Sequence, residues 1–224
     1  MIQTATFSFL RNLAKNNDRE WFHAHKAGYE QAKQNVLDVA AQLIAAINTF
    51  DKTLGYPEPK KCLFRIARDT RFSYDKSPYK TNFGVIMNPD GSPRSNLSGY
   101  YMHVEPGQCF LSSGIYMPMP DTLKAVRTAI EEDFSEFLKI LSQKELVRKI
   151  GDLSRDDDAL SRVPKGFDKD SPAAEYLKLK HFYVMVAVSD KEMTATDFVK
   201  KAASLYKIMY PFNSFMNRVI TRDM

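Results

Sequence analysis

The sequence is poor in the residues that usually build metal centres and disulfide frameworks. It contains two cysteines, Cys62 and Cys109, and four histidines in 224 residues. The cysteines lie far apart and form no pair with metal-ligand spacing, and neither an HExxH pattern nor a Cys/His cluster occurs. We therefore expect no metal site, no cofactor, and a reducing compartment in which disulfides are rare.

Long apolar runs are also lacking. No stretch approaches the roughly 20 apolar residues of a membrane-spanning helix, and the first residues turn polar before the apolar region of a signal peptide is complete. Glycine-rich phosphate loops, dinucleotide fingerprints and nucleophile-elbow patterns do not occur either. These absences predict a cytoplasmic protein with no membrane partner. They indicate nothing about its oligomeric state.

The composition is that of an ordinary globular protein. Hydrophobic residues make up 44% of the chain, charged residues make up 26%, and the net charge is +5. This charge is compatible with anionic partners but lies below that of a dedicated nucleic-acid coat. The length suits one large domain, and we predict a single domain over residues 1–224.

Helical periodicity marks the two ends of the chain. Asn17 followed by Glu20 forms a capping-box pattern, and apolar residues then recur at steps of three and four as far as Phe50. This spacing predicts one helix of about 30 residues. Further helices are expected over residues 120–141 and 142–150, after Ser171, and over residues 194–210, where Pro211 interrupts the last one.

Between residues 62 and 116 the apolar period changes to two, which predicts strands. The predicted strands are Cys62–Asp69, Asn82–Met87, Gly99–Glu105 and Gln108–Ile115, followed by His181–Val188. Long helices around hairpin-connected strands indicate an α+β fold. We expect an antiparallel, hairpin-rich sheet that packs with a long N-terminal helix and further C-terminal helices.

The segment over residues 64–81, FRIARDTRFSYDKSPYKT, interleaves cations with aromatic residues. The planar guanidinium fork suits carboxylate and phosphate groups, so we predict ligand-binding roles for Arg65, Arg68, Arg71, Lys76, Tyr79 and Lys80. In an unbroken strand Arg65 and Arg71 share one face and Arg68 points to the other, so all three converge only with a bulge or a turn. In the alternative interpretation, Asp69 and Asp75 neutralise the arginines and the segment only supports the fold.

Strand alternation separates two faces around the turn at residues 105–108. Met102, Val104, Cys109 and Leu111 share an apolar side, which should be core. Tyr101 and His103 occupy the other side, where Tyr101 would orient a ligand and His103 is the candidate catalytic acid or base, since its reference pKa is about 6.5. In the alternative, this face is half-exposed and His103 is only hydrogen-bonded.

Four segments carry a resemblance to a known family: LRNLAKNNDREWFHAHKAGYE, FRIARDTRFSYDKSPYKTNFG, SGYYMHVEPGQCFLSSGIYMP and LSRVPKGFDKDSPAAEYLKLKHF. The chain resembles a widespread bacterial and fungal family of conserved proteins catalogued as a domain of unknown function. The resemblance covers nearly the whole chain, and RDxRFSxDKSPYK is its most distinctive part. The resemblance implies the fold but no activity, because the family has no settled activity. Relatives often carry histidine where this chain has Ser171, so a role of that histidine does not transfer.

These observations predict a protein that binds a small phosphate-containing or carboxylate ligand through an arginine-rich pocket, with enzymatic activity left open. Cations interleaved with aromatics also suit a nucleic-acid-binding module, which combines phosphate contacts with base stacking. A structural or partner-docking protein is the third hypothesis. In that case the arginine block serves only the fold.

Overall fold

The computed structural model describes residues 1–71, 73–155 and 159–222. The chain divides into two compact units, each assembled from separate stretches. Unit 1 comprises Met1–Pro93, Tyr101–Leu111 and Ala187–Ser204, and unit 2 comprises Arg94–Tyr100, Ser112–Val186 and Leu205–Met224. The single-domain organisation of residues 1–224 stays a prediction.

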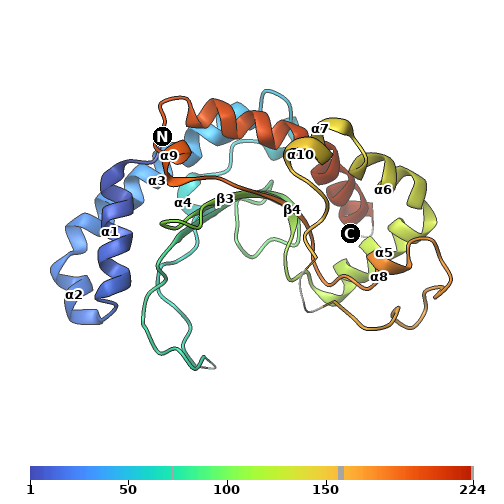
Figure 1. The fold of residues 1–224 in the computed structure, drawn as a ribbon, viewed down its shortest axis with the longest axis horizontal. Helices are drawn as coiled ribbons and strands as arrows, with labels where there is room; N and C mark the ends of the chain where they lie inside the picture. The colour runs from blue at the N-terminus through green and yellow to red at the C-terminus, as the bar shows by residue number, and fades with distance from the viewer. Residues whose placement is uncertain (72, 156–158, 223–224) are drawn as a thin grey trace. The chain divides into compact units, whose positions relative to one another are not determined.

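Helices make up most of the N-terminal part of unit 1 (Figure 1). In chain order they are α1 (Thr4–Lys15), α2 (Arg19–Ala24), α3 (Lys26–Ile47), the 3-10 helix η1 (Lys52–Leu54) and α4 (Pro59–Cys62), and the short α9 (Asp190–Met193) belongs to the same unit. α3 contacts α1, α2 and α4. It is the long N-terminal helix of the predicted fold, and its Val36, Val39 and Leu43 are buried on the predicted apolar stripe.

The long helix is nevertheless shorter than the sequence pattern predicts. His25 departs from helical geometry at φ −109° and ψ 20°, and its ring nitrogen Nδ1 lies 2.8 Å from the carbonyl oxygen of Trp21. The prediction that Asn17 caps the helix was also wrong. Asp18 accepts the N–H of Trp21 at 2.8 Å instead, which leaves the Asn17 side chain available for a different contact.

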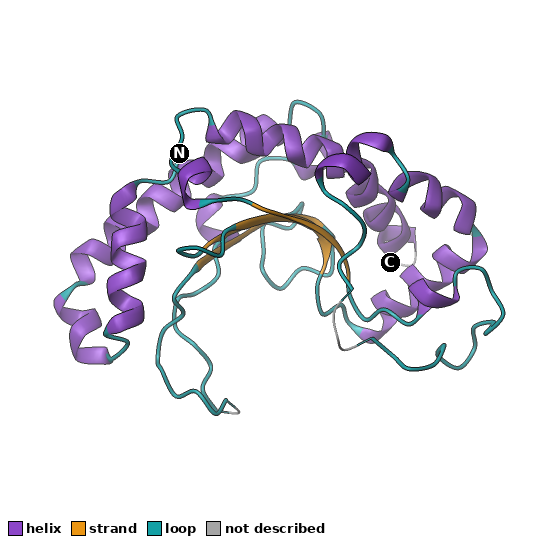
Figure 2. Ribbon diagram, in the orientation of Figure 1, coloured by secondary structure: helices purple, strands orange, loops and turns teal. Residues whose placement is uncertain are grey.

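Four strands form one antiparallel sheet, shown in orange in Figure 2. Its strands are β1 (Phe83–Met87), β2 (Gly99–Val104), β3 (Phe110–Ile115) and β4 (Phe182–Ala187), in the order β1-β2-β3-β4. The predicted α+β class and the antiparallel sheet are therefore confirmed. Within unit 1, α3 and α4 contact β1.

The predicted strand Cys62–Asp69 was wrong. Cys62 ends the helix α4, which Pro59 opens, and proline suits the first turn of a helix because its missing N–H would be unpaired there anyway. The rest of the segment makes isolated antiparallel bridges, Leu63 with Val85 and Ala67 with Tyr79. Irregular backbone between these bridges replaces the continuous ladder that a strand requires.

The apolar side of β2 and the following turn forms part of the core, as alternation predicts. Met102, Val104 and Leu111 are fully buried, and Cys109 is 3% exposed. Burying a side chain of this size contributes on the order of 1.5–3 kcal/mol. Because the register fixes which residues face the core, it also fixes Tyr101 and His103 on the opposite face.

Helices again dominate the later part of the chain. α5 (Pro120–Glu132), α6 (Phe134–Leu141), α7 (Lys144–Lys149) and α8 (Ala174–Leu177) belong to unit 2, and α10 (Phe198–Arg222) closes the chain. Pro211 lies inside α10 and does not interrupt it, contrary to the prediction. Phe212, Phe215 and Met216 on the next turns are buried, and this packing outweighs the lost backbone donor. None of the described helices combines the length and apolar composition that crossing a bilayer requires.

Gly114 in β3 is expected to resist any substitution. It has φ +138°, and an added Cβ would lie 2.2 Å from the Phe182 carbonyl oxygen and 2.6 Å from Tyr183 Cα. Because backbone atoms cannot move aside cheaply, Gly114→Ala should lower the free energy of unfolding by about 2 kcal/mol or more. Urea unfolding measures the change.

Gly28→Ala is the matched control for this prediction. Gly28 lies in α3, and its added Cβ would meet Phe9 at an ordinary 3.5 Å. Alanine should leave stability unchanged or raise it by up to about 1 kcal/mol, because glycine is a poor helix former. Equal effects of the two substitutions would contradict the strand pairing at Gly114.

Candidate functional site

The arginine-rich segment folds back on itself as a ribbon that extends β1. We define the ribbon as residues 63–68 and 78–82, and its tip as residues 69–77, of which Phe72 lies outside the described residues. The N–H of Phe64 donates to Gly84 O at 2.9 Å, that of Lys80 to Ile66 O at 2.8 Å, and that of Arg68 to Pro78 O at 2.9 Å. Figure 1 shows this long excursion between α4 and β1.

Tyr79 fastens the ribbon to the start of α2. The Asn17 side-chain amide donates to the Tyr79 carbonyl oxygen at 2.9 Å, and its oxygen accepts the Tyr79 N–H at 3.1 Å. The Tyr79 ring stacks on Phe22 with centroids 3.9 Å apart. Two hydrogen bonds between the Asn17 side chain and the Tyr79 backbone, together with a stacked ring, therefore hold segments that are far apart in the sequence.

Arg68 organises the tip. Its Nη1 donates to the Asp75 carboxylate and to Ser77 Oγ at 2.7 Å, and its Nη2 donates to Ser73 Oγ at 3.3 Å. Asp75 in turn accepts the Ser77 N–H at 2.9 Å and its hydroxyl at 2.6 Å. Hydrogen bonds from Ser77 and from Arg68 lower the pKa of the Asp75 carboxyl. This guanidinium is thus held inside a local network.

Arg71 pairs with Asp69 at the outside of the tip. Nε and Nη2 of Arg71 donate to the two carboxylate oxygens at 3.0 and 2.7 Å, and the Arg71 side chain is 76% exposed. Hydrogen bonds from Arg71 lower the pKa of Asp69 to about 2. Because the folded-state pKa is depressed, the pair persists as pH falls and is lost only near that value.

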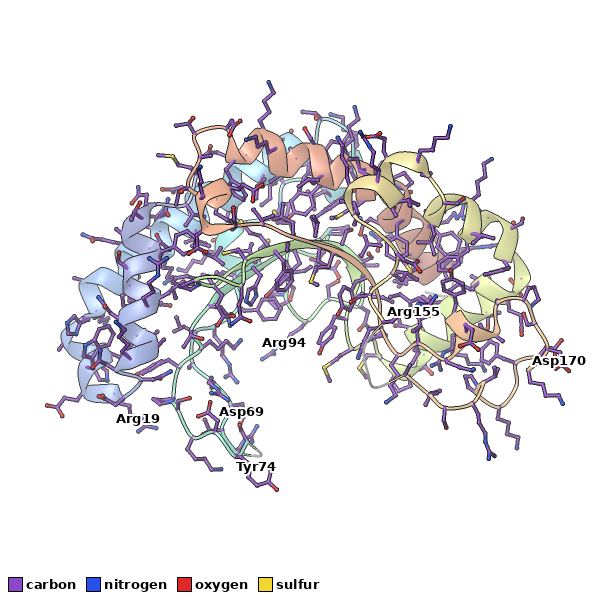
Figure 3. The ribbon with its side chains drawn as sticks, viewed as in Figure 1. Arg19, Asp69, Tyr74, Arg94, Arg155 and Asp170 are labelled. Atoms are coloured by element: carbon purple, nitrogen blue, oxygen red, sulfur yellow. The ribbon has the colours of Figure 1, made fainter. Side chains whose placement is uncertain are left out.

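A cleft of about 680 Å³ lies between the start of α2 and the ribbon. This volume falls within the range of small-molecule sites, about 300–1,000 Å³. The lining residues belong to the start of α2, to the ribbon and to its tip: Asn17, Asp18, Arg19, Glu20, Ala67, Arg68, Thr70, Lys76, Pro78 and Tyr79. In Figure 3, Arg19 marks the α2 side of the cleft, and Asp69 and Tyr74 mark the tip on the other side, all within unit 1.

The polar face of β2 carries a hydrogen-bonded chain of three side chains. Tyr101 Oη lies 3.0 Å from His103 Nδ1, and His103 Nε2 lies 3.0 Å from Glu105 Oε2. The other Glu105 oxygen accepts the Thr81 hydroxyl at 2.8 Å. Burial, and to a smaller extent Glu105, raises the pKa of Tyr101 to about 12.

Aromatic rings enclose this chain. The Phe110 ring stacks on His103 with centroids 4.5 Å apart, and the Phe64 ring meets Tyr101 edge-on at 6.1 Å. Lys80 Nζ lies 5.3 Å from the centre of the Phe64 ring. Burial lowers the pKa of Lys80, and the nearby Arg65 lowers it further. The polar face of β2 and the ribbon residues Phe64, Arg65 and Lys80, which we call the root of the ribbon, therefore adjoin each other.

The structure distributes the predicted site residues over three places. Arg68, Lys76 and Tyr79 line the cleft. Arg71 lies on the exposed side of the tip. The remaining four belong to the root of the ribbon and the sheet face: Arg65, Lys80, Tyr101 and His103. Their roles in binding or catalysis stay predictions.

Three residues of the cleft and of the sheet face escaped the sequence reasoning. Arg19 lines the cleft, but its exposed position on a short helix gives no linear signal. Asn17 reaches Tyr79 across 62 positions, which no local pattern reveals. Glu105 was detectable, because it follows Tyr101 and His103 at the same alternating spacing. Within residues 1–71, 73–155 and 159–222, no three His, Cys, Asp or Glu side chains gather as a metal site would require.

Replacing Arg68 by alanine is expected to loosen the tip without unfolding the protein. The substitution removes the donor that joins Asp75, Ser77 and Ser73, while the core lies elsewhere. Amides of residues 70–71 and 73–77 should therefore exchange faster with deuterium, at a nearly unchanged melting temperature.

Arg71→Ala is the control for this prediction. The pair with Asp69 is exposed, and exposed ion pairs contribute little, so exchange in the tip should stay close to that of the unmodified protein. A sharp fall in melting temperature on Arg68→Ala would instead favour a purely structural role of the arginine block. Unchanged exchange would contradict the network.

Comparison with known protein families finds a match over most of the chain. The family described as "Conserved hypothetical protein (DUF2461)" matches residues 5–215. No curated protein and no solved structure matches the chain. The family match covers most of the 224 residues, in agreement with the resemblance carried by the four sequence segments. The chain therefore belongs to the DUF2461 family of conserved hypothetical proteins.

Proposed function

We propose that the protein binds a small anionic ligand, a phosphate-containing or carboxylate compound, in the cleft between α2 and the ribbon. The observation that carries this proposal is the presence of Arg19 and Lys76 on two different segments lining one cleft of about 680 Å³. Two cations from separate segments approach an anion from different directions. A cleft of this size accommodates a metabolite rather than a bare ion.

The donors in this cleft are not all occupied. Arg19 forms no ion pair within the described part of the chain, and Lys76 donates one bond, to the Thr70 carbonyl oxygen at 2.9 Å. An ammonium group has three donors, so two remain for a ligand. The Tyr79 hydroxyl has no hydrogen-bond partner among the described residues and supplies another donor.

Two carboxylates at the cleft, Asp18 and Asp75, already have hydrogen-bond donors within the protein. Asp18 accepts the Trp21 N–H as a helix cap, and Asp75 neutralises Arg68 beside the cleft. The network around Arg68 therefore acts as a preformed wall, which reduces the ordering cost of binding. Glu20 is the remaining lining carboxylate, and it disfavours anions that extend toward it.

Titration with inorganic pyrophosphate and with citrate tests this function for both ligand chemistries. Either anion should raise the melting temperature by mass action if it binds the native state. Arg19→Met and Lys76→Met should each weaken binding by about tenfold or more, because a hydrogen bond to a charged group contributes on the order of 1.5–3 kcal/mol. Calorimetry at fixed ionic strength measures both effects.

Lys15→Met is the matched control, because Lys15 is exposed at the end of α1 and does not line the cleft. It should bind both anions as the unmodified protein does. If Lys15→Met weakened anion binding equally, the overall positive charge of the protein would explain the binding, and the cleft would not. The proposal fails if neither anion shifts the melting temperature.

A second candidate function, binding of single-stranded nucleic acid, rests on the tip of the ribbon. Tyr74 is fully exposed, with a relative accessibility of 106%, and Arg71 nearby in the tip is 76% exposed. Figure 3 shows Tyr74 at the outer end of the ribbon. An exposed aromatic ring beside cations suits base stacking combined with phosphate contacts.

Fluorescence anisotropy with labelled thymidine and uridine oligonucleotides distinguishes this candidate from the cleft. Nucleic-acid binding should weaken steeply with salt, and Tyr74→Ala should reduce affinity about fivefold or more, since stacking contributes on the order of 1–3 kcal/mol per base. Tyr56→Ala is the control, because Tyr56 is also exposed, at 79%, but lies outside the ribbon. Negligible binding at all salt concentrations removes this candidate.

A further inference from the structure

The two sides of the cleft carry an excess of opposite charge. Residues 18–20 at the start of α2 contribute two carboxylates and one guanidinium to the lining. The ribbon and its tip contribute Arg68 and Lys76, and Asp75 already neutralises Arg68. The α2 side therefore has a negative charge in excess, and the opposite side keeps the positive charge of Lys76.

Glu20 accounts for the negative excess of the α2 side. It lines the cleft, is exposed, and forms no hydrogen bond or ion pair with any described residue. The capping box expected from Asn17 and Glu20 would have occupied this side chain. Because Asp18 caps α2 instead, Glu20 is the second residue of the helix and returns no bond to the cap. Its carboxylate is left for a group from outside the chain.

Asp18 adds a second acceptor on the same side. Its Oδ1 accepts the N–H of Trp21 at 2.8 Å, whereas its Oδ2 has no donor within the described part of the chain. A carboxylate offers about four acceptor sites on its two oxygens. Two carboxylates with free acceptor sites thus line a cleft that also carries two available cations, Arg19 and Lys76.

We infer that the ligand of the cleft is a zwitterion, whose phosphate or carboxylate group pairs with Arg19 and Lys76 while an ammonium group of the same molecule pairs with Glu20. This inference rests on the proposed function and assigns the second charge of the same ligand. A ligand with negative charge alone leaves Glu20 unpaired and is repelled by it. The cleft therefore selects aminoalkyl phosphates or amino acids over alkyl phosphates and simple carboxylates.

The helix itself offers another reason for an acidic residue at this position. A carboxylate in the first turn of a helix is stabilised by the partial positive charge of the unpaired N–H groups, and Glu20 lies in the first turn of α2. That effect acts on folding and is the same whichever ligand is present. Discrimination between ligands, and not stability, therefore tests the inference.

Two pairs of ligands that differ only in an ammonium group provide this test. They are O-phosphoethanolamine with ethyl phosphate, and 4-aminobutanoate with butanoate. At pH 8 the amines are protonated and the phosphate monoesters are dianions. Nuclear magnetic resonance at constant ionic strength, with a chelator present to remove metal ions, follows the amide signals of residues 17–20, Lys76 and Tyr79. The amine-bearing member should bind about fivefold more tightly, the upper range for an exposed ion pair.

Variants of the α2 side separate the two charges of the ligand. Glu20→Gln keeps the shape of the side chain and should make the two members of a pair bind equally. Glu20→Lys should reverse the preference. Arg19→Met should weaken both members and leave the preference in place, because it removes a partner of the anionic group only.

Asp121→Asn is the matched control. Asp121 is exposed, occupies the second position of α5 as Glu20 does in α2, and does not line the cleft. The substitution removes the same charge and the same helix-dipole contribution, so it should leave the preference for the amine intact. Loss of the preference in Asp121→Asn would overturn the inference.

The outcomes distinguish this inference from the proposed function. Equal binding within both pairs, or a preference that survives Glu20→Gln, would overturn the inference and leave the anion site standing. So would a protein that binds pyrophosphate or citrate but neither amine-bearing ligand. If none of these anions binds, the proposed function fails and the inference with it. A preference in one pair only supports the inference and assigns the anionic group to phosphate or to carboxylate.

Discussion

The docking of Tyr79 onto the start of α2 is the interaction on which the candidate site depends. Tyr79 bridges to Ala67 across the ribbon, exchanges two hydrogen bonds with Asn17 and stacks on Phe22. These contacts bring Arg68 and Lys76 to the same cleft as Arg19 and so form that cleft. Without them the ribbon would be a two-stranded excursion with little apolar burial, and such ribbons are marginally stable by themselves.

Electrostatic pairing decides which cations remain for a ligand. The two arginines of the tip, Arg68 and Arg71, are each matched by a carboxylate within the same segment, so their main effect is to shape the backbone. Arg19, Lys76 and Lys80 lack such partners among the described residues. Since an unpaired cation gains more from an anion than a paired one does, the proposed binding relies on two of these less conspicuous residues, Arg19 and Lys76.

The sequence predicted those features that local pattern controls. Alternation placed Tyr101 and His103 on the face opposite Met102 and Val104, because a strand's register is fixed by its buried side. The prediction failed where distant contacts decide, because Asn17 bonds the ribbon instead of capping a helix and Pro211 is accommodated by packing. It also failed at His25, where a local contact with Trp21 accompanies a break in a helix whose apolar stripe continues. The arginine block was recognised, and the alternative in which Asp69 and Asp75 neutralise the arginines agrees with the ion pairs of Arg71 and Arg68. Which of its cations line the cleft depends on turn geometry that no spacing rule supplies.

Proton contacts between the rings of Phe22 and Tyr79 test the central claim most directly. With ring centroids 3.9 Å apart, nuclear Overhauser effects between the two rings should be strong in the protein without added ligand, and Asn17→Ala should weaken them. Strong effects would establish that the ribbon is docked on α2 and that the cleft is preformed. Their absence in the folded protein would contradict the docking, and with it the cleft.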